Sequence, residues 1–143
     1  MSLRRAFEYH HIVGFEETNL VGNVYYANHI RWQGRCREMF LHQHCPEILA
    51  ELQRDLALIT LRCSCEYLSE LAAFDALTVR MRLAELTQNR IVFSFDYVKR
   101  GDGFETLAAR GEQAVACMRR TAEGGLEPCP VPRGLREALK NFQ

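Results

Sequence analysis

The fold of this chain is decided by residues 19–37, which read NLVGNVYYANHIRWQGRCR. The first half predicts a loop, because Gly22 and Asn23 tolerate turn dihedrals and Asn28 can cap the N-terminus of a helix. From Asn28 to about His44 the chain contains no proline, and this segment is the longest helical candidate. The stretch therefore predicts a loop that leads directly into a long helix.

Arg37 is out of place on that helix. At 3.6 residues per turn, one narrow sector must face water, and it holds Arg31, Arg35, Glu38 and His42. The wide remaining arc is apolar and surrounds Arg37 with Ile30, Trp32, Gly34, Cys36, Met39, Phe40 and Leu41. A guanidinium there is costly unless an anionic or strongly hydrogen-bonding group meets it. Either Arg37 reaches the surface or a carboxylate of a distant strand, or it serves chemistry.

The rest of the chain has the two-residue period of β-strands. A first strand is expected from Phe7 to Val13, and a short amphipathic helix from Pro46 to Arg54. Beyond it, apolar residues alternate in four segments, which we interpret as strands over residues 57–67, 77–83, 91–97 and 106–119. Short connections at 86–90 and 101–103 favour antiparallel hairpins. A turn-rich tail over 124–132 then leads to a last expected helix over 135–142.

The strand over residues 57–67 has one apolar and one polar face. The alternation places Thr60 on the polar face, and the apolar face holds Ala57, Ile59, Leu61, Cys63, Cys65 and Tyr67. The six cysteines of the chain include no Cys-x-x-Cys pair. We interpret them as small buried residues of a reducing compartment, and expect neither a disulfide framework nor a zinc site.

Length and composition bound the class of protein. The 143 residues, 48% of them apolar, fit a single domain over 1–143. Eighteen basic residues balance eighteen acidic ones without a block of like charge, so no nucleic-acid partner is expected. No apolar run reaches membrane-spanning length or resembles a secretion signal. We therefore expect a cytoplasmic protein without a membrane partner.

One strand, one long helix and four further strands predict an α+β fold. A five-stranded antiparallel sheet wrapped around the long central helix would hide the apolar face of every strand. It would also explain why the helix is apolar over most of its circumference. Such a sheet has edges, and pairing of edges between subunits predicts a homodimer, which we expect to pair further into a tetramer.

Residues 17–29, which read ETNLVGNVYYANH, carry a family resemblance together with Arg37, eighteen residues after Asn19. The pattern resembles the hotdog-fold thioesterases of the 4-hydroxybenzoyl-CoA thioesterase type. This sequence departs from the family motif at three positions: Asn19 stands for the catalytic aspartate, Gly34 for an acidic residue of the helix, and His29 for a tyrosine. An amide is not basic enough near neutral pH to act as the nucleophile or general base that the aspartate provides.

Asn19 followed by residues 28–40, NHIRWQGRCREMF, resembles the small thioesterases of enediyne antibiotic biosynthesis. This resemblance implies a partner, the acyl carrier protein of an iterative polyketide synthase, reached through its phosphopantetheine arm. It implies hydrolysis of a β-ketoacyl thioester of a conjugated polyene, with loss of carbon dioxide giving a methyl ketone. No cofactor and no metal are expected.

The resemblance also implies a site in which hydrogen-bond donors replace the carboxylate. Asn19 and Arg37 are the expected catalytic residues: the amide holds the water or the carbonyl, and the guanidinium supplies positive charge to an enolate or β-keto oxygen. Unpaired amides of residues 25–29, at the positive end of the helix dipole, suit an oxyanion hole. The residues expected to bind substrate are Tyr25, Tyr26, His29 and Thr60.

Each of these residues also has an ordinary structural interpretation. Asn19 can stabilise its own turn, the two tyrosines can pack in the core, and His29 can be a polar surface or interface residue. Thr60 is included because the polar face of its strand approaches the neighbouring active site in hotdog dimers. Two other functions stay open: a general acyl-CoA thioesterase, and a non-catalytic acyl-binding hotdog module that has lost the family carboxylate.

Overall fold

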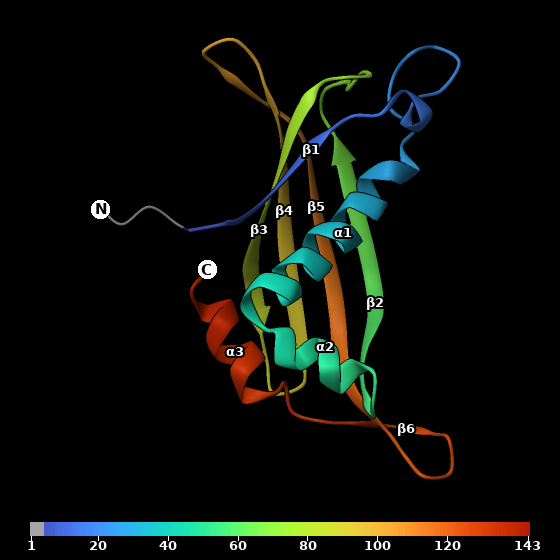
Figure 1. Ribbon diagram of the computed structural model, residues 1–143, viewed down its shortest axis with the longest axis vertical. Coiled ribbons are helices and arrows are strands. Elements are labelled where there is room, and N and C mark those ends of the chain that lie inside the picture. Colours follow the sequence, from blue (N-terminus) through green and yellow to red (C-terminus); the bar gives the residue numbers. More distant parts are fainter. Residues whose placement is uncertain (1–4) are drawn as a thin grey trace.

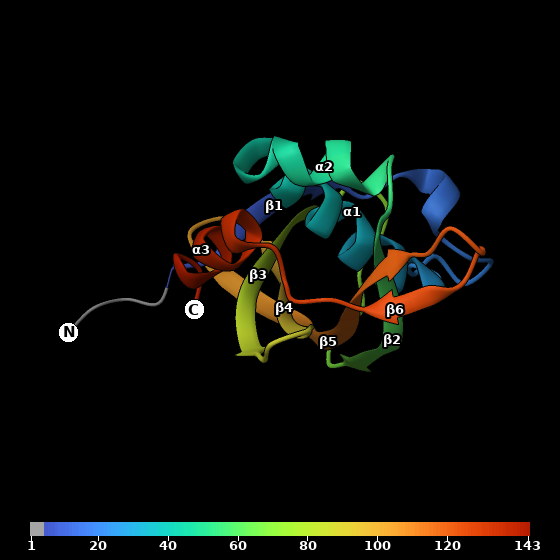
Figure 2. The ribbon, with the colours of Figure 1, turned by 90° about the horizontal axis from the view of Figure 1, so that it is seen from below.

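A curled antiparallel sheet wraps around one long helix, α1 (Ala27–His44), in the computed structural model of the chain, which describes residues 5–143 (Figure 1). The strands are β1 (Phe7–Ile12), β2 (Leu56–Tyr67), β3 (Ala76–Leu86), β4 (Arg90–Arg100), β5 (Glu105–Arg120) and β6 (Leu126–Pro128). Their order in the sheet is β1-β3-β4-β5-β2, and β6 pairs with the end of β5. Figure 2 shows the sheet curving around α1, with α2 (Pro46–Leu52) over the helix on the open side. The predicted α+β architecture is confirmed.

The helix α1 has the buried and exposed faces that its sequence predicts. Its apolar arc contributes Trp32, Cys36, Phe40 and Leu41 to the core, and its charged sector is exposed. The expected cap at Asn28 is wrong: the cap residue is Tyr26, and its side chain makes no capping hydrogen bond. Asn28 is 6% exposed, and its Nδ2 donates to the carbonyl of Glu17 over 2.8 Å. It therefore fastens the loop to the first helical turn.

The strand β2 differs from its prediction in one respect. Its pairing with β5 shifts register between Thr60 and Arg62, so Leu61 is an extra residue in the ladder. Such a bulge exchanges the two faces of a strand. Leu56 and Leu58 therefore pack on the core before the bulge and Cys65 after it, and the single apolar face expected over residues 57–67 is wrong.

The strand β2 is also an edge of the sheet, with β5 as its only neighbour within residues 5–143. Its second half is largely exposed for that reason, and this includes Cys63, which was expected to be buried. All six cysteines are free thiols.

The C-terminal part closes one end of the sheet. The expected last helix is α3 (Arg133–Lys140), which buries Leu135 and Leu139. The backbone N–H of Leu83 on β3 donates to the carbonyl of Phe142 over 2.6 Å. The short strand β6 lies where only a turn-rich tail was expected, because three residues are too few to show an alternating pattern. None of the helices within residues 5–143 combines the length and apolar composition that a membrane crossing needs.

Candidate active site

Arg37 meets an amide rather than a carboxylate. Its Nη1 donates to Oε1 of Gln113 on β5 over 2.7 Å, and Gln113 is 4% exposed. Nε2 of Gln113 in turn lies 3.8 Å from Sγ of Cys63 on β2. Burial lowers the pKa of Arg37. Within residues 5–143 no carboxylate lies within ion-pair distance of this guanidinium, so its charge is hydrogen-bonded but not neutralised.

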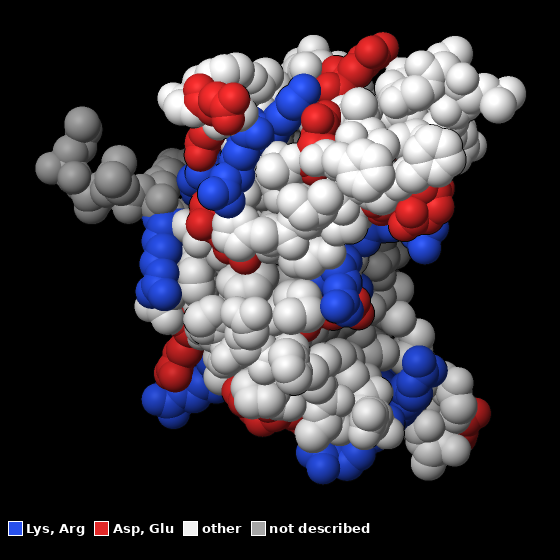
Figure 3. Space-filling model, turned by 45° about the horizontal axis from the view of Figure 1, so that its top comes forward, with Lys and Arg blue, Asp and Glu red and all other residues white. Residues whose placement is uncertain are grey.

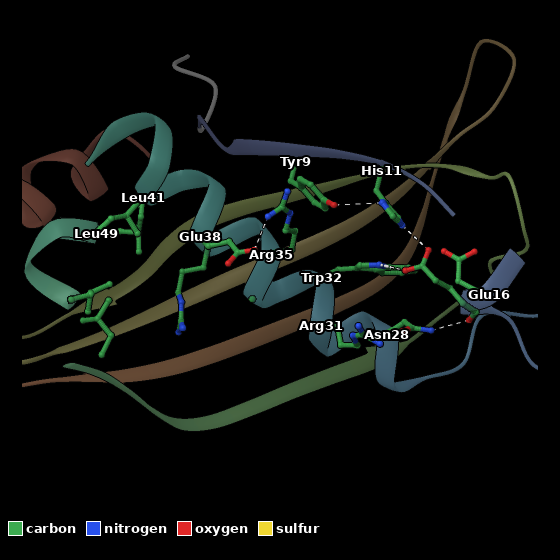
Figure 4. A pocket seen from close by; sticks show the side chains of 15 residues that line it. Tyr9, His11, Glu16, Asn28, Arg31, Trp32, Arg35, Glu38, Leu41 and Leu49 are labelled. Atoms are coloured by element: carbon green, nitrogen blue, oxygen red, sulfur yellow. Dashed lines mark hydrogen bonds and ion pairs between the residues drawn. The ribbon is translucent and has the colours of Figure 1, made fainter. Parts of the chain in front are cut away.

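A groove of about 820 Å³ runs along α1 beside Arg37. Figure 4 shows its lining side chains, which come from β1, the 3₁₀ turn Phe15–Glu17, α1, α2 and the start of β2. One end is apolar and is formed by Leu41, Leu49, Leu52 and Leu58. The other end is aromatic and polar and is formed by Tyr9, His11, Glu17, Asn28 and Trp32. A volume of this order is typical of small-molecule sites.

Glu17 organises the polar end of this groove, and the sequence analysis missed it. One carboxylate oxygen accepts from the backbone N–H of Gly14 over 2.8 Å and lies 2.7 Å from Nε2 of His11. The other accepts from Nε1 of Trp32 over 2.8 Å. Burial acts to raise the pKa of Glu17, but the bonds from Gly14, His11 and Trp32 outweigh it and lower the pKa. A carboxylate held in this way is a weak base, and its role is to join β1, the loop and α1.

Asn19 lies in a second, smaller hollow of about 360 Å³, which Tyr26, His29 and Tyr67 also line. Its Oδ1 accepts from the backbone N–H of Val21 over 3.0 Å, which is the turn-stabilising bond that an asparagine makes in a loop. Its Nδ2 has no hydrogen-bond partner in the part of the chain that the structure describes. The structure thus brings Asn19, Tyr26 and His29 together.

His29 is a buried, aromatic-walled side chain, so the interpretation as a polar surface residue is wrong. It is 4% exposed, and its ring centroid lies 4.7 Å from that of Tyr67, 5.2 Å from Trp32 and 5.5 Å from Tyr97. Burial lowers the pKa of His29, and the nearby carbonyl of Tyr26 offsets this in part. The imidazole therefore faces the hollow in its neutral form at neutral pH.

Tyr25 and Tyr26 are surface residues and do not pack in the core. They are 46% and 62% exposed, with ring centroids 4.6 Å apart. The hydroxyl of Tyr67 donates to the carbonyl of Tyr26 over 2.8 Å and ties the helix start to β2. Figure 3 shows one face of the molecule, on which charged side chains are scattered with uncharged residues between them.

Two amides at the start of α1 are unpaired within residues 5–143, those of Tyr26 and Ala27. The backbone N–H of Tyr25 donates to the carbonyl of Glu17 over 2.9 Å, and the backbone N–H of Asn28 donates to the carbonyl of Tyr25 over 3.0 Å. The expected donor set of residues 25–29 is therefore narrower than the sequence suggests. Two adjacent N–H groups at the positive end of a helix dipole still suit an oxyanion.

One subunit does not bring all the expected site residues together. Arg37 lines the groove along α1, whereas Asn19 lines the smaller hollow. Arg37 stands ten residues beyond the start of α1, which corresponds to about 15 Å at 1.5 Å per residue. Thr60 is exposed on β2, immediately before the bulge.

Comparisons with known proteins agree with this geometry. The family model of the thioesterase-like superfamily matches residues 13–139. A protein of Aquifex aeolicus (strain VF5) that carries an esterase name is 30% identical over 135 residues, which is 94% of this chain and 98% of that protein. The dynemicin thioesterase, whose crystal structures describe induced-fit and allosteric effects upon polyene binding, is 50% identical with a TM-score of 0.92, and 96% of each chain is covered.

A mutant of 4-hydroxybenzoyl-CoA thioesterase complexed with 4-hydroxybenzoyl-CoA shares the fold at 18% identity and a TM-score of 0.82, covering 94% of this chain and 99% of that one. The family match spans nearly the whole described chain, and the fold and the sequence point to the same group of enzymes. The chain therefore belongs to the thioesterase-like superfamily and is a hotdog-fold thioester hydrolase.

Proposed function

We propose that this enzyme hydrolyses a polyene β-ketoacyl thioester carried on the phosphopantetheine arm of the acyl carrier protein of an iterative enediyne polyketide synthase. Water adds to the thioester carbonyl, the C–S bond breaks, and the carrier thiol and a β-keto acid are released. The β-keto acid then loses carbon dioxide, and protonation of the enol gives a methyl ketone. No oxidant or reductant is needed for either step.

The observation that carries this proposal is the 50% identity, over 96% of the chain, to the dynemicin thioesterase with its polyene-binding structures. The environment of Glu17 supports it. Glu17, the acidic residue with the most protein hydrogen bonds in the groove, is occupied by three donors, and its pKa is lowered. A site that works through donors suits a β-ketoacyl thioester, because the β-keto group makes the ester easier to hydrolyse and the free acid prone to decarboxylate.

In this proposal the thioester carbonyl lies at the start of α1. The free amides of Tyr26 and Ala27 stabilise the oxyanion, and Nδ2 of Asn19 holds the water or the carbonyl. Removing one such donor typically costs about 10²-fold in rate. Neutral His29 and Tyr26 line the path of the substrate in the hollow, and the exposed ring of Tyr25 lies beside that of Tyr26.

Arg37 supplies positive charge to the β-keto oxygen or enolate, and this requires a second copy of the chain. Arg37, Gln113 and Cys63 form a connected path from α1 to the free edge at β2. A long free edge is suited to antiparallel pairing with another copy. We propose a homodimer joined there, pairing further into a tetramer, in which Arg37 and Thr60 of one copy reach the Asn19 hollow of the other. Six free thiols agree with a reducing cytoplasm as its location.

The test compares two matched substrates of equal chain length, a β-ketoacyl group on an acyl carrier protein and a saturated acyl-CoA. We expect kcat/KM to favour the β-keto substrate by at least about tenfold, with methyl ketone among the products in mass spectrometry. A preference for the saturated coenzyme A ester would make the protein a general acyl-CoA thioesterase. Tight binding without turnover of either substrate would make it an acyl-binding module.

A further inference from the structure

Gly34 lies in the middle of α1, where nothing within the subunit requires a glycine. Glycine in a helix interior is less favourable than alanine, because more backbone entropy is lost. Its backbone does not need glycine either: within residues 5–143 the glycines with positive φ are Gly22, Gly103 and Gly124. A Cβ built on Gly34 would meet nothing within 4 Å.

Gly111 on β5 shows the contrast. A Cβ there would collide with Nε2 of Gln33 and with the carbonyl of Ser64, which are themselves joined by a hydrogen bond of 2.9 Å. Packing inside the subunit therefore requires Gly111 to be glycine. The space over Gly34 is left open by the described residues, so a ligand can approach the helix backbone there.

The open space over Gly34 belongs to the groove along α1. Gly34, Arg37 and Leu41 are spaced three and four residues apart, so they follow one stripe of the helix toward the apolar end of the groove. On the other side lie the half-buried ring of Tyr9 and the edge of the largely buried Trp32 (Figure 4). The groove residues on α1 run from Asn28 to Leu41, which is about 20 Å of helix at 1.5 Å per residue. That length suits an extended chain.

We propose that Gly34 determines the specificity of this enzyme for the acyl group. The acyl group of the substrate lies in the groove and comes closest to the helix backbone at Gly34, beside the charge of Arg37. This rests on the proposed function, since it assumes a long acyl substrate. The apolar end of the groove, formed by Leu41, Leu49, Leu52 and Leu58, suits the hydrocarbon part of such a substrate. Charged side chains also line the groove, and they include Arg31, Arg35 and Glu38 as well as Arg37.

Gly34→Ala tests the proposal by adding one methyl group to the floor of the groove. The variant should fold with an unchanged or raised Tm and an unchanged sedimentation coefficient. Its affinity for a conjugated polyenoic acid, followed by the fluorescence of the chain, should fall about tenfold. KM for a long-chain thioester should rise by a similar factor, and the kinetics of a four-carbon acyl-CoA should stay within about twofold. Gly34→Ser, with a slightly larger side chain, should repeat the result.

Gln43→Ala is the matched control, because Gln43 is exposed on the same helix and does not line the groove. It should leave polyene binding unchanged. Binding of the free acid needs no turnover, so a protein that binds the acid but hydrolyses nothing would refute the proposed function and leave the Gly34 inference standing. Polyene affinity within about twofold of wild type in Gly34→Ala, or a change in its oligomeric state, would overturn the inference. The second outcome would show that another protein copy occupies the space.

Discussion

Arg37 in the middle of α1 and Gln113 on β5 are joined by a hydrogen bond of 2.7 Å from Nη1 to Oε1. The bond satisfies one guanidinium donor and one buried amide acceptor, but an amide does not neutralise a charge. Burial lowers the pKa of Arg37, which means that the environment disfavours the cation. A protein that retains such a cation without a carboxylate keeps its charge available for another anionic group.

Arg37→Ala is expected to lower kcat by about 10²-fold. The Tm should fall only slightly, because the desolvation cost of the cation is removed along with its bond to Gln113. The paired control is Gln113→Leu, which breaks the same bond and keeps the charge. It should destabilise the fold at least as much and reduce kcat far less. Full activity in Arg37→Ala, or failure of that variant to fold, would assign Arg37 a structural role instead.

Asn19→Ala should cost more activity than Leu20→Ala, although both side chains are exposed in the same loop. The reason is that Asn19 carries an unpaired Nδ2 beside His29, whereas Leu20 contributes only loop shape. Asn19→Ser separates the two roles of the asparagine, because serine can accept the turn bond from Val21 but has no amide donor. Steady-state kinetics should rank Leu20→Ala above both Asn19 variants. Equal losses in all three would mean that only the loop conformation matters.

The fold could be predicted from the sequence where apolar residues keep one helical or strand period over a long segment. Eighteen helical residues with one charged sector predict α1, and long alternating runs predict β3, β4 and β5. The errors arose where one residue changes the outcome. The bulge at Leu61 exchanges the faces of β2, and nothing in the alternation of its neighbours marks it. Cys63 is exposed because β2 is an edge strand. The order of strands in the sheet cannot be read from the local sequence pattern.

The site could be predicted in part, for a similar reason. Arg37 was conspicuous because it interrupts an apolar arc of its own helix. Gln113, its partner, is 76 residues away and looks like any polar strand residue. Glu17 looks like a solvated charge beside Glu16, and its partners on β1 and α1 become visible only once those elements are adjacent. The position of His29 near the start of α1 was predicted correctly. Its burial could not be predicted, because it depends on Tyr67 of β2 and Tyr97 of β4, which are distant in sequence.

Glu17→Gln is expected to destabilise the protein by about 1–3 kcal/mol at pH 7, because three donors lose a charged acceptor. The pKa of Glu17 in the folded state is lowered from its ordinary value of 4.5. The contribution of this carboxylate is therefore complete above about pH 4.5 and is lost as the pH falls through the folded-state pKa. Urea unfolding of both proteins should show a difference that shrinks in acid. Glu16→Gln, without such partners, should behave like wild type, and a Glu17→Gln difference that is independent of pH would contradict the assignment.

The free edge of β2 predicts self-association, and sedimentation equilibrium measures it directly. We expect a dimer or a tetramer at micromolar concentration, because an uncovered strand with Leu61 and Tyr67 exposed is suited to pairing. Leu61→Lys places a charge on that edge and should shift the equilibrium toward monomer without a change in the far-UV circular dichroism spectrum. A wild-type protein that stays monomeric would remove the basis for a shared site.

Complementation decides whether Asn19 and Arg37 act across the subunit interface. Each single variant, Asn19→Ala or Arg37→Ala, should be nearly inactive alone. In a mixed dimer, one site would combine both substitutions, and the other would combine the intact Asn19 of one copy with the intact Arg37 of its partner. Random pairing of equal amounts makes half of the dimers mixed, so co-expression should restore about a quarter of the wild-type activity for a two-fold dimer. A site formed within one subunit would give no restoration, because every copy then lacks one of its own two residues. If Thr60→Ala is also nearly inactive alone, the same experiment is repeated with Thr60→Ala in place of Arg37→Ala. Restoration would then show that Thr60 also reaches the neighbouring hollow.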